Sequence, residues 1–167
     1  MTIGDVFSIV AAIFGIFLTS WATVVGVALL TPAAAERARR AIEEPKRALW
    51  RGFSILLPGI ILSIGLLGSP LPLAKGLGWL VTLAWLALGA IGASGLAQAA
   101  GRRIQDLDPT MSAYPAICRG AAYVVGASIL PVLGWFGFGP LLFMAAIGAG
   151  WKAVVRPRAQ IEAGEAA

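Results

Sequence analysis

Long apolar runs separated by short charged segments dominate the chain. Three of them, residues 6–30, 52–68 and 79–101, contain no Asp, Glu, Lys or Arg. At about 1.5 Å per residue, the first run would form a helix of about 37 Å, enough to cross a hydrocarbon core of about 30 Å. The pattern therefore predicts three transmembrane helices. Pro58 lies inside the second run, where we expect a kink because proline removes one helical hydrogen bond.

The segment between the second and third runs is rich in proline and glycine. Residues 69–78 read Ser-Pro-Leu-Pro-Leu-Ala-Lys-Gly-Leu-Gly, a composition that is typical of turns. We therefore expect residues 52–101 to form an antiparallel transmembrane hairpin.

A fourth uncharged run, residues 120–150, is interrupted at its centre. The interruption consists of helix-breaking and aromatic residues: Pro131, Gly134, Trp135, Phe136, Gly137, Gly139 and Pro140. Because glycine and proline are unfavourable inside helices, the run predicts either one kinked crossing or a helical hairpin with this segment as its tip. The expected fold is all-α: a polytopic membrane helical bundle of three transmembrane helices plus a C-terminal kinked helix or helical hairpin.

These runs divide the chain into six parts. They are a first transmembrane helix (1–30), a basic helical loop (31–51), a transmembrane hairpin (52–101), a second loop (102–119), a kinked or hairpin segment (120–151) and a basic-to-polar tail (152–167). The first run is too long for the apolar region of a signal peptide, so we expect it to stay in the mature protein.

The distribution of basic side chains predicts how the chain is oriented. Residues 31–51 hold six of them: Arg37, Arg39, Arg40, Lys46, Arg47 and Arg51. The others lie in the second loop (Arg102, Arg103, Arg119), the tail (Lys152, Arg156, Arg158) and the hairpin turn (Lys75). Lys and Arg concentrate in cytoplasmic loops. We therefore expect both loops and the C-terminus in the cytoplasm and the N-terminus outside, which favours the hairpin for 120–150.

The first basic loop is expected to be helical. Thr31 and Pro32 are typical of the N-cap and first position of a helix, and Pro45 should break or bend it. Charged pairs four residues apart follow: Glu36–Arg40, Arg39–Glu43, Arg40–Glu44 and Glu43–Arg47. The loop is either a solvated connector or a site where its six basic residues contact lipid headgroups or a partner.

Composition excludes much of catalysis and metal binding. Hydrophobic residues make up 59% of the chain and charged ones 13%, the mean hydropathy is +0.85, and there is no histidine. A His-ligated metal or haem and a Ser-His-Asp triad are therefore impossible. The runs hold no acidic or basic side chain, which disfavours a proton-coupled transporter. We expect no cofactor, no metal and no nucleic-acid partner, since the basic segments lack interleaved aromatic residues.

Two carboxylates of the second loop are the only polar group that suggests chemistry. Asp106 and Asp108, beside Arg102 and Arg103, could hold a divalent cation against a phosphate. However, Asp108 followed by proline is equally typical of a turn or a helix cap. We favour the capping interpretation.

Small and hydroxyl side chains point to helix packing. Gly89, Ala93 and Ala97 recur every four residues in the third run, and a similar small face includes Gly148. Such stripes let helices approach closely in lipid, so we predict these four as packing residues. Serine and threonine within the runs are expected to bond to the carbonyl four residues earlier.

The six tryptophans fall into two groups. Trp50, Trp79 and Trp151 lie at the ends of runs, as in the aromatic belts of membrane proteins. Trp21, Trp85 and Trp135 lie within runs, where a buried indole N–H needs an acceptor on another helix or on a partner.

Residues 127–150 combine Leu130-Pro131, Gly134-Trp135-Phe136 and a closing Gly148-Ala149-Gly150. This pattern resembles the membrane tails of bactofilin-type bacterial cytoskeletal proteins. The chain departs from that family because it has no soluble β-rich domain. The resemblance implies anchoring or scaffolding and no active site.

The leading functional expectation is a non-catalytic accessory or scaffold subunit of a larger complex in the bacterial cytoplasmic membrane, of respiratory or photosynthetic type. Its partners would be membrane lipids and other membrane subunits. One alternative is a small oligomeric transporter or channel, since backbone carbonyls can line a pore. A second is a lipid-modifying enzyme that uses Asp106 and Asp108.

Overall fold

A computed structural model describes residues 3–130 and 132–155. Within them the chain forms six α-helices and one π-helical turn: α1 (Ile3–Leu30), α2 (Pro32–Ile42), α3 (Pro45–Leu67), α4 (Pro72–Leu107), α5 (Ala113–Ile129), η1 (Gly134–Phe138) and α6 (Gly139–Val155). The all-α class is thus confirmed. Pro131 of the expected tip, and Arg156 and Arg158 of the tail, lie outside the described residues.

Four described segments are long and apolar enough to cross a membrane. They are Ile3–Leu30, Pro45–Leu67, Pro72–Leu107 and Gly134–Val155. The first three contain the three predicted transmembrane runs. The fourth joins η1 to α6, so the uncharged run 120–150 is divided between α5 and this last segment. This length and composition fit a multi-pass membrane protein.

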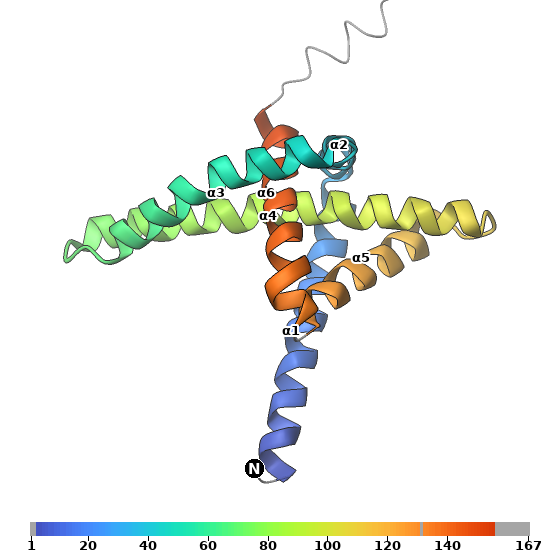
Figure 1. Cartoon of the computed structure of the whole chain (residues 1–167), viewed down its shortest axis with the longest axis horizontal. Coiled ribbons are helices and arrows are strands. Elements are labelled where there is room, and N and C mark those ends of the chain that lie inside the picture. The colour runs from blue at the N-terminus through green and yellow to red at the C-terminus, as the bar shows by residue number, and fades with distance from the viewer. Residues whose placement is uncertain (1–2, 131, 156–167) are drawn as a thin grey trace, which may run out of the picture.

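The two halves of α1 have different surroundings. Its first half projects away from the other helices (Figure 1), and large apolar side chains there are exposed, Phe7 by 74% and Phe14 by 64%. Its second half is packed against the protein through Val24, Val25 and Ala28. The first helix is therefore held to the rest of the molecule by its C-terminal half.

Two prolines set the boundaries of α2 and α3. Pro32 begins α2 and Pro45 begins α3, because proline lacks the N–H that has no helical partner at a first position. The predicted break at Pro45 is confirmed. Thr31 occupies the N-cap position of α2, but the expected side-chain cap is wrong. Its hydroxyl is already used by the last turn of α1, where it donates to the carbonyl oxygen of Val27 at 2.8 Å.

The helices α3 and α4 form the expected antiparallel hairpin (Figure 1). Its turn is shorter than predicted, residues 68–71, because α4 already begins at Pro72. The helix α3 continues through Pro58 without interruption in its assignment. With 36 residues, α4 is about 54 Å long, well beyond a hydrocarbon core of about 30 Å.

Most of the predicted second loop, 102–119, is helical instead. The helix α4 extends to Leu107 and α5 begins at Ala113, which leaves residues 108–112 as the connection. Within it, the Gln105 amide donates to the carbonyl oxygen of Met111 at 3.1 Å. Charged residues signal contact with water and do not by themselves end a helix, so the charge pattern overestimated the length of this loop.

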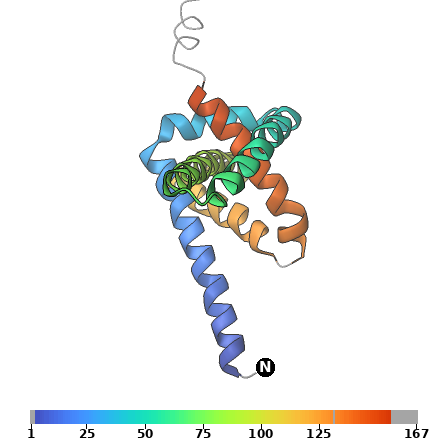
Figure 2. The same ribbon diagram turned by 90° about the vertical axis from the view of Figure 1, so that its left-hand side faces the viewer.

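The fourth run contains two helices rather than one kinked helix. α5 ends at Ile129, and after residues 130–133 the chain continues as η1 and α6. α5 and α6 diverge in a V, visible in both views (Figures 1 and 2). The chain therefore reverses direction here, as in the hairpin alternative, but its two arms separate instead of lying side by side.

The long helices are not parallel to one another. α1 and α6 run in one general direction, and the α3–α4 hairpin crosses them (Figure 1). In the view turned by 90°, the helices of the hairpin are seen nearly end-on, in agreement with the crosswise arrangement (Figure 2). Helices that cross touch only over a short stretch, so close contact depends on small side chains at the crossing.

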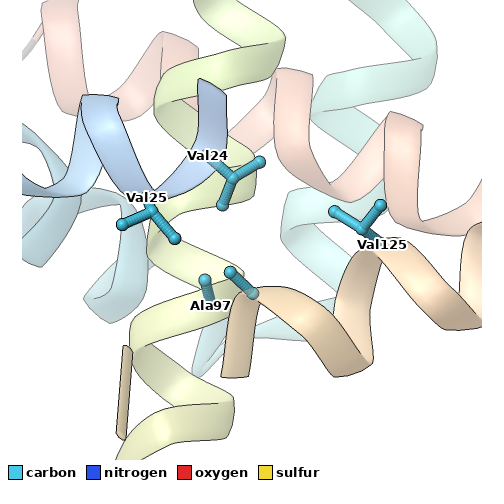
Figure 3. Packing of buried hydrophobic residues seen from close by; sticks show 5 residues of the cluster. Val24, Val25, Ala97 and Val125 are labelled. Atoms are coloured by element: carbon cyan, nitrogen blue, oxygen red, sulfur yellow. The ribbon is translucent and has the colours of Figure 1, made fainter. Parts of the chain in front are cut away.

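The core is made of correspondingly small side chains. Val24 and Val25 of α1 pack with Ala97 of α4 and Val125 of α5 (Figure 3). A second cluster joins α2 to α6 and consists of Ala38, Ala41, Ala149 and Ala153. The two clusters hold four helices around α4, while most large apolar side chains remain on the outside.

Several hydroxyl side chains of the apolar helices bond locally, as predicted, whereas the buried Ser63 hydroxyl has no hydrogen-bond partner among the described residues. Thr23, Thr82 and Ser128 each donate to the carbonyl oxygen four residues earlier, at distances of 2.8 to 2.9 Å. Ser94 is fully buried and donates to the carbonyl oxygen of Ile91 at 2.7 Å. These contacts satisfy the hydroxyls without a ligand.

Candidate functional site

Glycines bring the backbones of α3 and α6 into contact. A Cβ atom placed on Gly52 would overlap the carbonyl group of Met144. A Cβ atom on Gly148 would overlap the carbonyl oxygen of Ala48 and lie 2.8 Å from the Gly52 nitrogen. Each glycine thus faces the backbone of the other helix, and neither accepts a side chain unless the helices move apart.

α4 is crossed by three further helices, each at its own glycine. The contacts are Gly92 against Ala146 of α6, Gly95 against Ala38 of α2, and Gly101 against Ala116 of α5. A Cβ atom on any of the three would come within 2.8 Å of the neighbouring helix. Gly150 and Gly120 meet α4 from the α6 and α5 sides, against the carbonyls of Leu88 and Ala97. The candidate functional site is therefore a set of glycine-mediated helix crossings centred on α4.

The four predicted packing residues all lie in or near these contacts. Gly148 belongs to the α3–α6 crossing, Ala97 is fully buried, and Ala93 packs against the cluster that contains Ala97. Gly89 is buried, but a Cβ atom there would meet only the Phe143 ring, at an ordinary 3.5 Å. Three of the four residues, Ala93, Ala97 and Gly148, thus lie in close helix contacts, and Gly89 lies in a looser one.

Sequence reasoning missed several of the close crossings. Gly92, Gly101 and Gly120 were not singled out, although each faces a neighbouring backbone. Small residues fall on several faces of α4, so spacing alone does not distinguish the face that meets another helix. The glycines themselves were the informative residues. Alanine is more favourable than glycine in a helix interior, so a glycine there suggests that a neighbouring helix leaves no room for a Cβ atom.

Two of the three tryptophans within the runs contact another helix, and Trp21 finds the acceptor that its indole N–H needs. Trp21 donates from its indole nitrogen to the carbonyl oxygen of Cys118 at 2.9 Å, which links α1 to α5. The ring of Trp85 lies where a Cβ atom on Gly59 would be, so it packs directly on the backbone of α3. Both residues join helices within this chain.

An ion network on α2 is centred on Glu36. Its carboxylate accepts hydrogen bonds from Arg39 at 2.7 and 2.9 Å and from Arg40 at 3.4 Å. Arg102 of α4 donates to the same carboxylate at 3.1 Å, and Arg39 also reaches Glu43 at 2.7 Å. The pairs Glu36–Arg40 and Arg39–Glu43 were predicted. Arg47 pairs instead with Glu44 at 2.9 Å, on the far side of the Pro45 break.

This network lowers the pKa of its central carboxylate, Glu36. The hydrogen bonds from Arg39 lower the pKa of Glu36 from 4.5 to about 2, against the opposing effect of burial, and the charges of Arg39 and Arg102 add to the decrease. Glu36 in turn raises the pKa of Arg39. Glu36 therefore stays ionised over the whole physiological range and ties α2 to α4.

We expect Glu36 to make stability depend on acid pH. Because its folded pKa lies below the unfolded value, its contribution is present above pH 4.5 and is lost as the pH falls toward 2. After allowance for solvent screening, the contribution amounts to about 2 kcal/mol. Unfolding of the wild type and of Glu36→Gln in a non-ionic detergent should differ by about this amount at pH 7. The difference should vanish near pH 2, and one that persists there would contradict the assignment.

A polar cleft lies beside the network, between α2, α4 and α5. Its volume is about 560 Å³, and its lining includes Glu36, Gln98, Arg102, Gln105 and Asp106. In the described part of the chain, no three Cys, Asp or Glu side chains are grouped as ligands for a metal ion. The cleft offers polar and charged groups of both signs without a recognisable catalytic arrangement.

The two acidic residues of the predicted second loop are not equivalent. Asp106 lines the polar cleft. Asp108 ends α4, and its carboxylate accepts hydrogen bonds from the Thr110 hydroxyl at 2.5 Å and the Thr110 amide at 3.2 Å. Asp108 thus stabilises a turn, as the favoured interpretation expected, but it caps no following helix, since α5 begins at Ala113.

The six basic residues predicted to contact headgroups or a partner do not form one uniform surface. Arg39 is only 15% exposed and serves the Glu36 network. Arg40 and Arg47 are about 70% exposed, although each has an acidic partner, and Lys46 is exposed. Arg37 donates to the carbonyl oxygen of Ala33 at 3.0 Å. Arg51 belongs to α3 and is half-buried.

The expected hairpin tip is a π-helical turn with exposed aromatic side chains. Gly134 is buried, and a Cβ atom there would lie 2.6 Å from the carbonyl oxygen of Ser128. Trp135 and Phe136 are 67% and 85% exposed. Gly137 has open space around it, Gly139 faces Gly134, and Pro140 follows in the first turn of α6. The aromatic side chains of the tip are thus uncovered within the described part of the chain.

The described part of the chain therefore defines an all-α protein with four candidate membrane-spanning segments that cross at glycine contacts. Comparison with protein-family models, with curated proteins and with solved structures finds no match. The resemblance of residues 127–150 to bactofilin-type membrane tails stays a prediction.

Proposed function

We propose that the chain is a non-catalytic accessory or scaffold subunit of a larger complex in the bacterial cytoplasmic membrane, and that it acts by helix packing. The observation that carries the proposal is the crosswise arrangement of its apolar helices (Figure 1). If α1 and α6 cross the bilayer, the α3–α4 hairpin lies across them and does not span it in the same direction. In a simple bundle, lipid covers the outer surface of all the helices. In this crosswise arrangement, we expect a partner protein to cover part of the apolar helix surface.

The free half of α1 supports the same proposal. Its large apolar side chains, among them Phe7, Ile9 and Phe14, are exposed and belong to neither buried cluster, although Phe14 lines a shallow apolar pocket against the end of α5. A second exposed apolar group is the tip formed by Trp135 and Phe136. Aromatic side chains of this kind are enriched where membrane proteins meet partners. The respiratory or photosynthetic type of the complex stays a prediction from the sequence.

The basic ends of the helices support the proposed orientation. The α2 cluster touches the C-terminal part of α6, and Arg102 of α4 bonds to Glu36 of α2. The first basic loop, Arg102 and the end of α6 thus lie close together, whereas Lys75 lies near the turn of the α3–α4 hairpin. We propose that this basic side faces the cytoplasm and that the N-terminus lies outside.

Purification from the native membrane in a mild detergent tests the proposal. The expected result is co-purification of at least one other membrane protein in stoichiometric amount, retained through size-exclusion chromatography. A monodisperse monomer without such a protein would contradict it. A homo-oligomer that conducts solute in liposomes would favour the channel alternative instead.

A further inference from the structure

Two cationic side chains from different helices meet beside the α3–α6 crossing. Arg51 of α3 and Lys152 of α6, together with Trp151 and Val155, line a pocket of about 190 Å³. The positions are adjacent because Gly52 and Gly148 hold the two helix backbones in contact just below them. The glycine crossing therefore fixes the distance between two side chains that are a hundred residues apart in sequence.

One nitrogen of the Arg51 guanidinium is not satisfied by the described part of the protein. Its Nη1 atom is buried and has no hydrogen-bond partner among the described residues. Arginine remains charged under all ordinary conditions, and a buried charged donor without an acceptor is costly. A negative charge in the adjoining pocket would offset part of this cost.

A carboxylate close to both cations, that of Glu44, is already engaged. Glu44 bonds to Arg47 at 2.9 Å, and this bond is the main reason that the pKa of Glu44 is lowered; the charges of Lys152 and Arg51 lower it further. The group thus contains three cations, Arg47, Arg51 and Lys152, and one anion. An excess of positive charge remains at the pocket.

The pocket lies at the boundary between the apolar and charged parts of both helices. Arg51 directly precedes the apolar run 52–68, and Lys152 follows the end of the run 120–150 by two residues. Trp50 and Trp151 stand beside them, with exposures of 70% and 42%. Tryptophan and basic residues at the end of an apolar helix mark the headgroup layer of a bilayer.

We propose that Arg51 and Lys152 form a binding site for a phosphate group. The planar guanidinium donates two parallel hydrogen bonds to phosphate oxygens, and the ammonium group adds a point charge from the other helix. The pocket volume exceeds that of several waters at about 30 Å³ each, which leaves room for one phosphate. The phosphate comes either from the headgroup of an anionic lipid or from a small phosphate in solution. This site is independent of the proposed accessory function.

Native mass spectrometry of the purified full chain tests the site and its source of phosphate. Phosphatidylglycerol, phosphatidylcholine and inorganic phosphate are added separately, and the bound fraction is measured for each. A headgroup site retains phosphatidylglycerol in preference to phosphatidylcholine, and inorganic phosphate neither binds nor competes at millimolar concentration. A site for free phosphate binds inorganic phosphate alone. Equal retention of both lipids and no binding of phosphate would overturn the proposal.

Two substitutions and a matched control tie the binding to these residues. Arg51→Gln and Lys152→Gln should each weaken phosphate-group binding about tenfold, since each removes a charged hydrogen-bond donor. Arg103→Gln removes the same charge from an exposed position on α4 and should leave binding unchanged. Lys152 is half-exposed, so its replacement keeps the fold testable by melting temperature. Wild-type affinity in a folded Lys152→Gln variant would exclude the two-helix site.

Discussion

Replacement of Gly92 by alanine is expected to destabilise the protein by about 2 kcal/mol. The new Cβ atom would overlap the Ala146 carbonyl and lie 2.6 Å from the Ala146 Cα atom, so α4 and α6 must separate. The better helix propensity of alanine offsets only about 0.5–1 kcal/mol of this cost. Gly92→Val, which is larger and β-branched, should lose more. Unfolding in mixed micelles of mild detergent and dodecyl sulfate measures the difference.

Gly65→Ala is the matched control for this substitution. Gly65 lies inside α3 with nothing near its Cβ position, so alanine should be neutral or should stabilise the protein by about 0.5 kcal/mol. Opposite signs at the two glycines would establish that the crossing, and not glycine content, determines stability. A Gly92→Ala protein as stable as Gly65→Ala would mean that α4 and α6 do not touch there.

Removal of the Trp21 side chain is the second large expected effect. Trp21→Ala should lower the free energy of unfolding by about 3 kcal/mol, because it deletes packing against the Val24–Ala97 cluster and leaves the Cys118 carbonyl without its donor. The loss should appear as release of α1 from α5. Protease accessibility of α1 reports that release independently of global unfolding.

Two further variants separate the contributions at Trp21. Trp21→Phe keeps most of the ring and removes the indole donor, so it should cost about 1 kcal/mol. Trp79→Ala removes a tryptophan that is 61% exposed and should change stability by no more than about 0.5 kcal/mol. Equal losses at Trp21 and Trp79 would show that α1 is not held by this contact.

Local features of the fold were predictable where short-range chemistry determines them. Charge-free apolar runs located the long helices, Pro32 located a helix start and Pro45 a helix break, because proline has a defined place in a helix. The local bonds of Thr23 and Thr82 followed from side-chain length alone. The cap at Thr31 failed because the preceding helix competes for the same hydroxyl, and such competition is a property of two elements together.

The crossings were not predictable to the same extent. The stripe of Gly89, Ala93 and Ala97 identified a packed face, but α4 meets several helices, and a single stripe describes only one contact. Gly92, Gly95 and Gly101 each meet a different helix. Which small residue faces which helix depends on crossing angle and order, and these are set by the whole set of contacts.

The crosswise arrangement of the helices could not be predicted from the sequence either. Hydropathy shows that a segment is long and apolar enough to cross a bilayer, whereas its tilt depends on packing against neighbours. The basic residues were assigned to separate loops, and the structure brings Arg102 to Glu36 and α6 to α2. The pocket of Arg51 and Lys152 arises from the same convergence and could not be read from spacing.

Site-specific photo-crosslinking from the free half of α1 tests the proposed accessory role most directly. A photoreactive residue at Phe14, 64% exposed, is compared in native membranes with one at Leu73, which is 86% exposed at the start of α4. We expect the photoreactive residue at position 14 to form a discrete adduct with another membrane protein. The residue at position 73 should form a much weaker adduct or none. Adducts with lipid alone at Phe14, in cells that contain the full complement of membrane proteins, would contradict it.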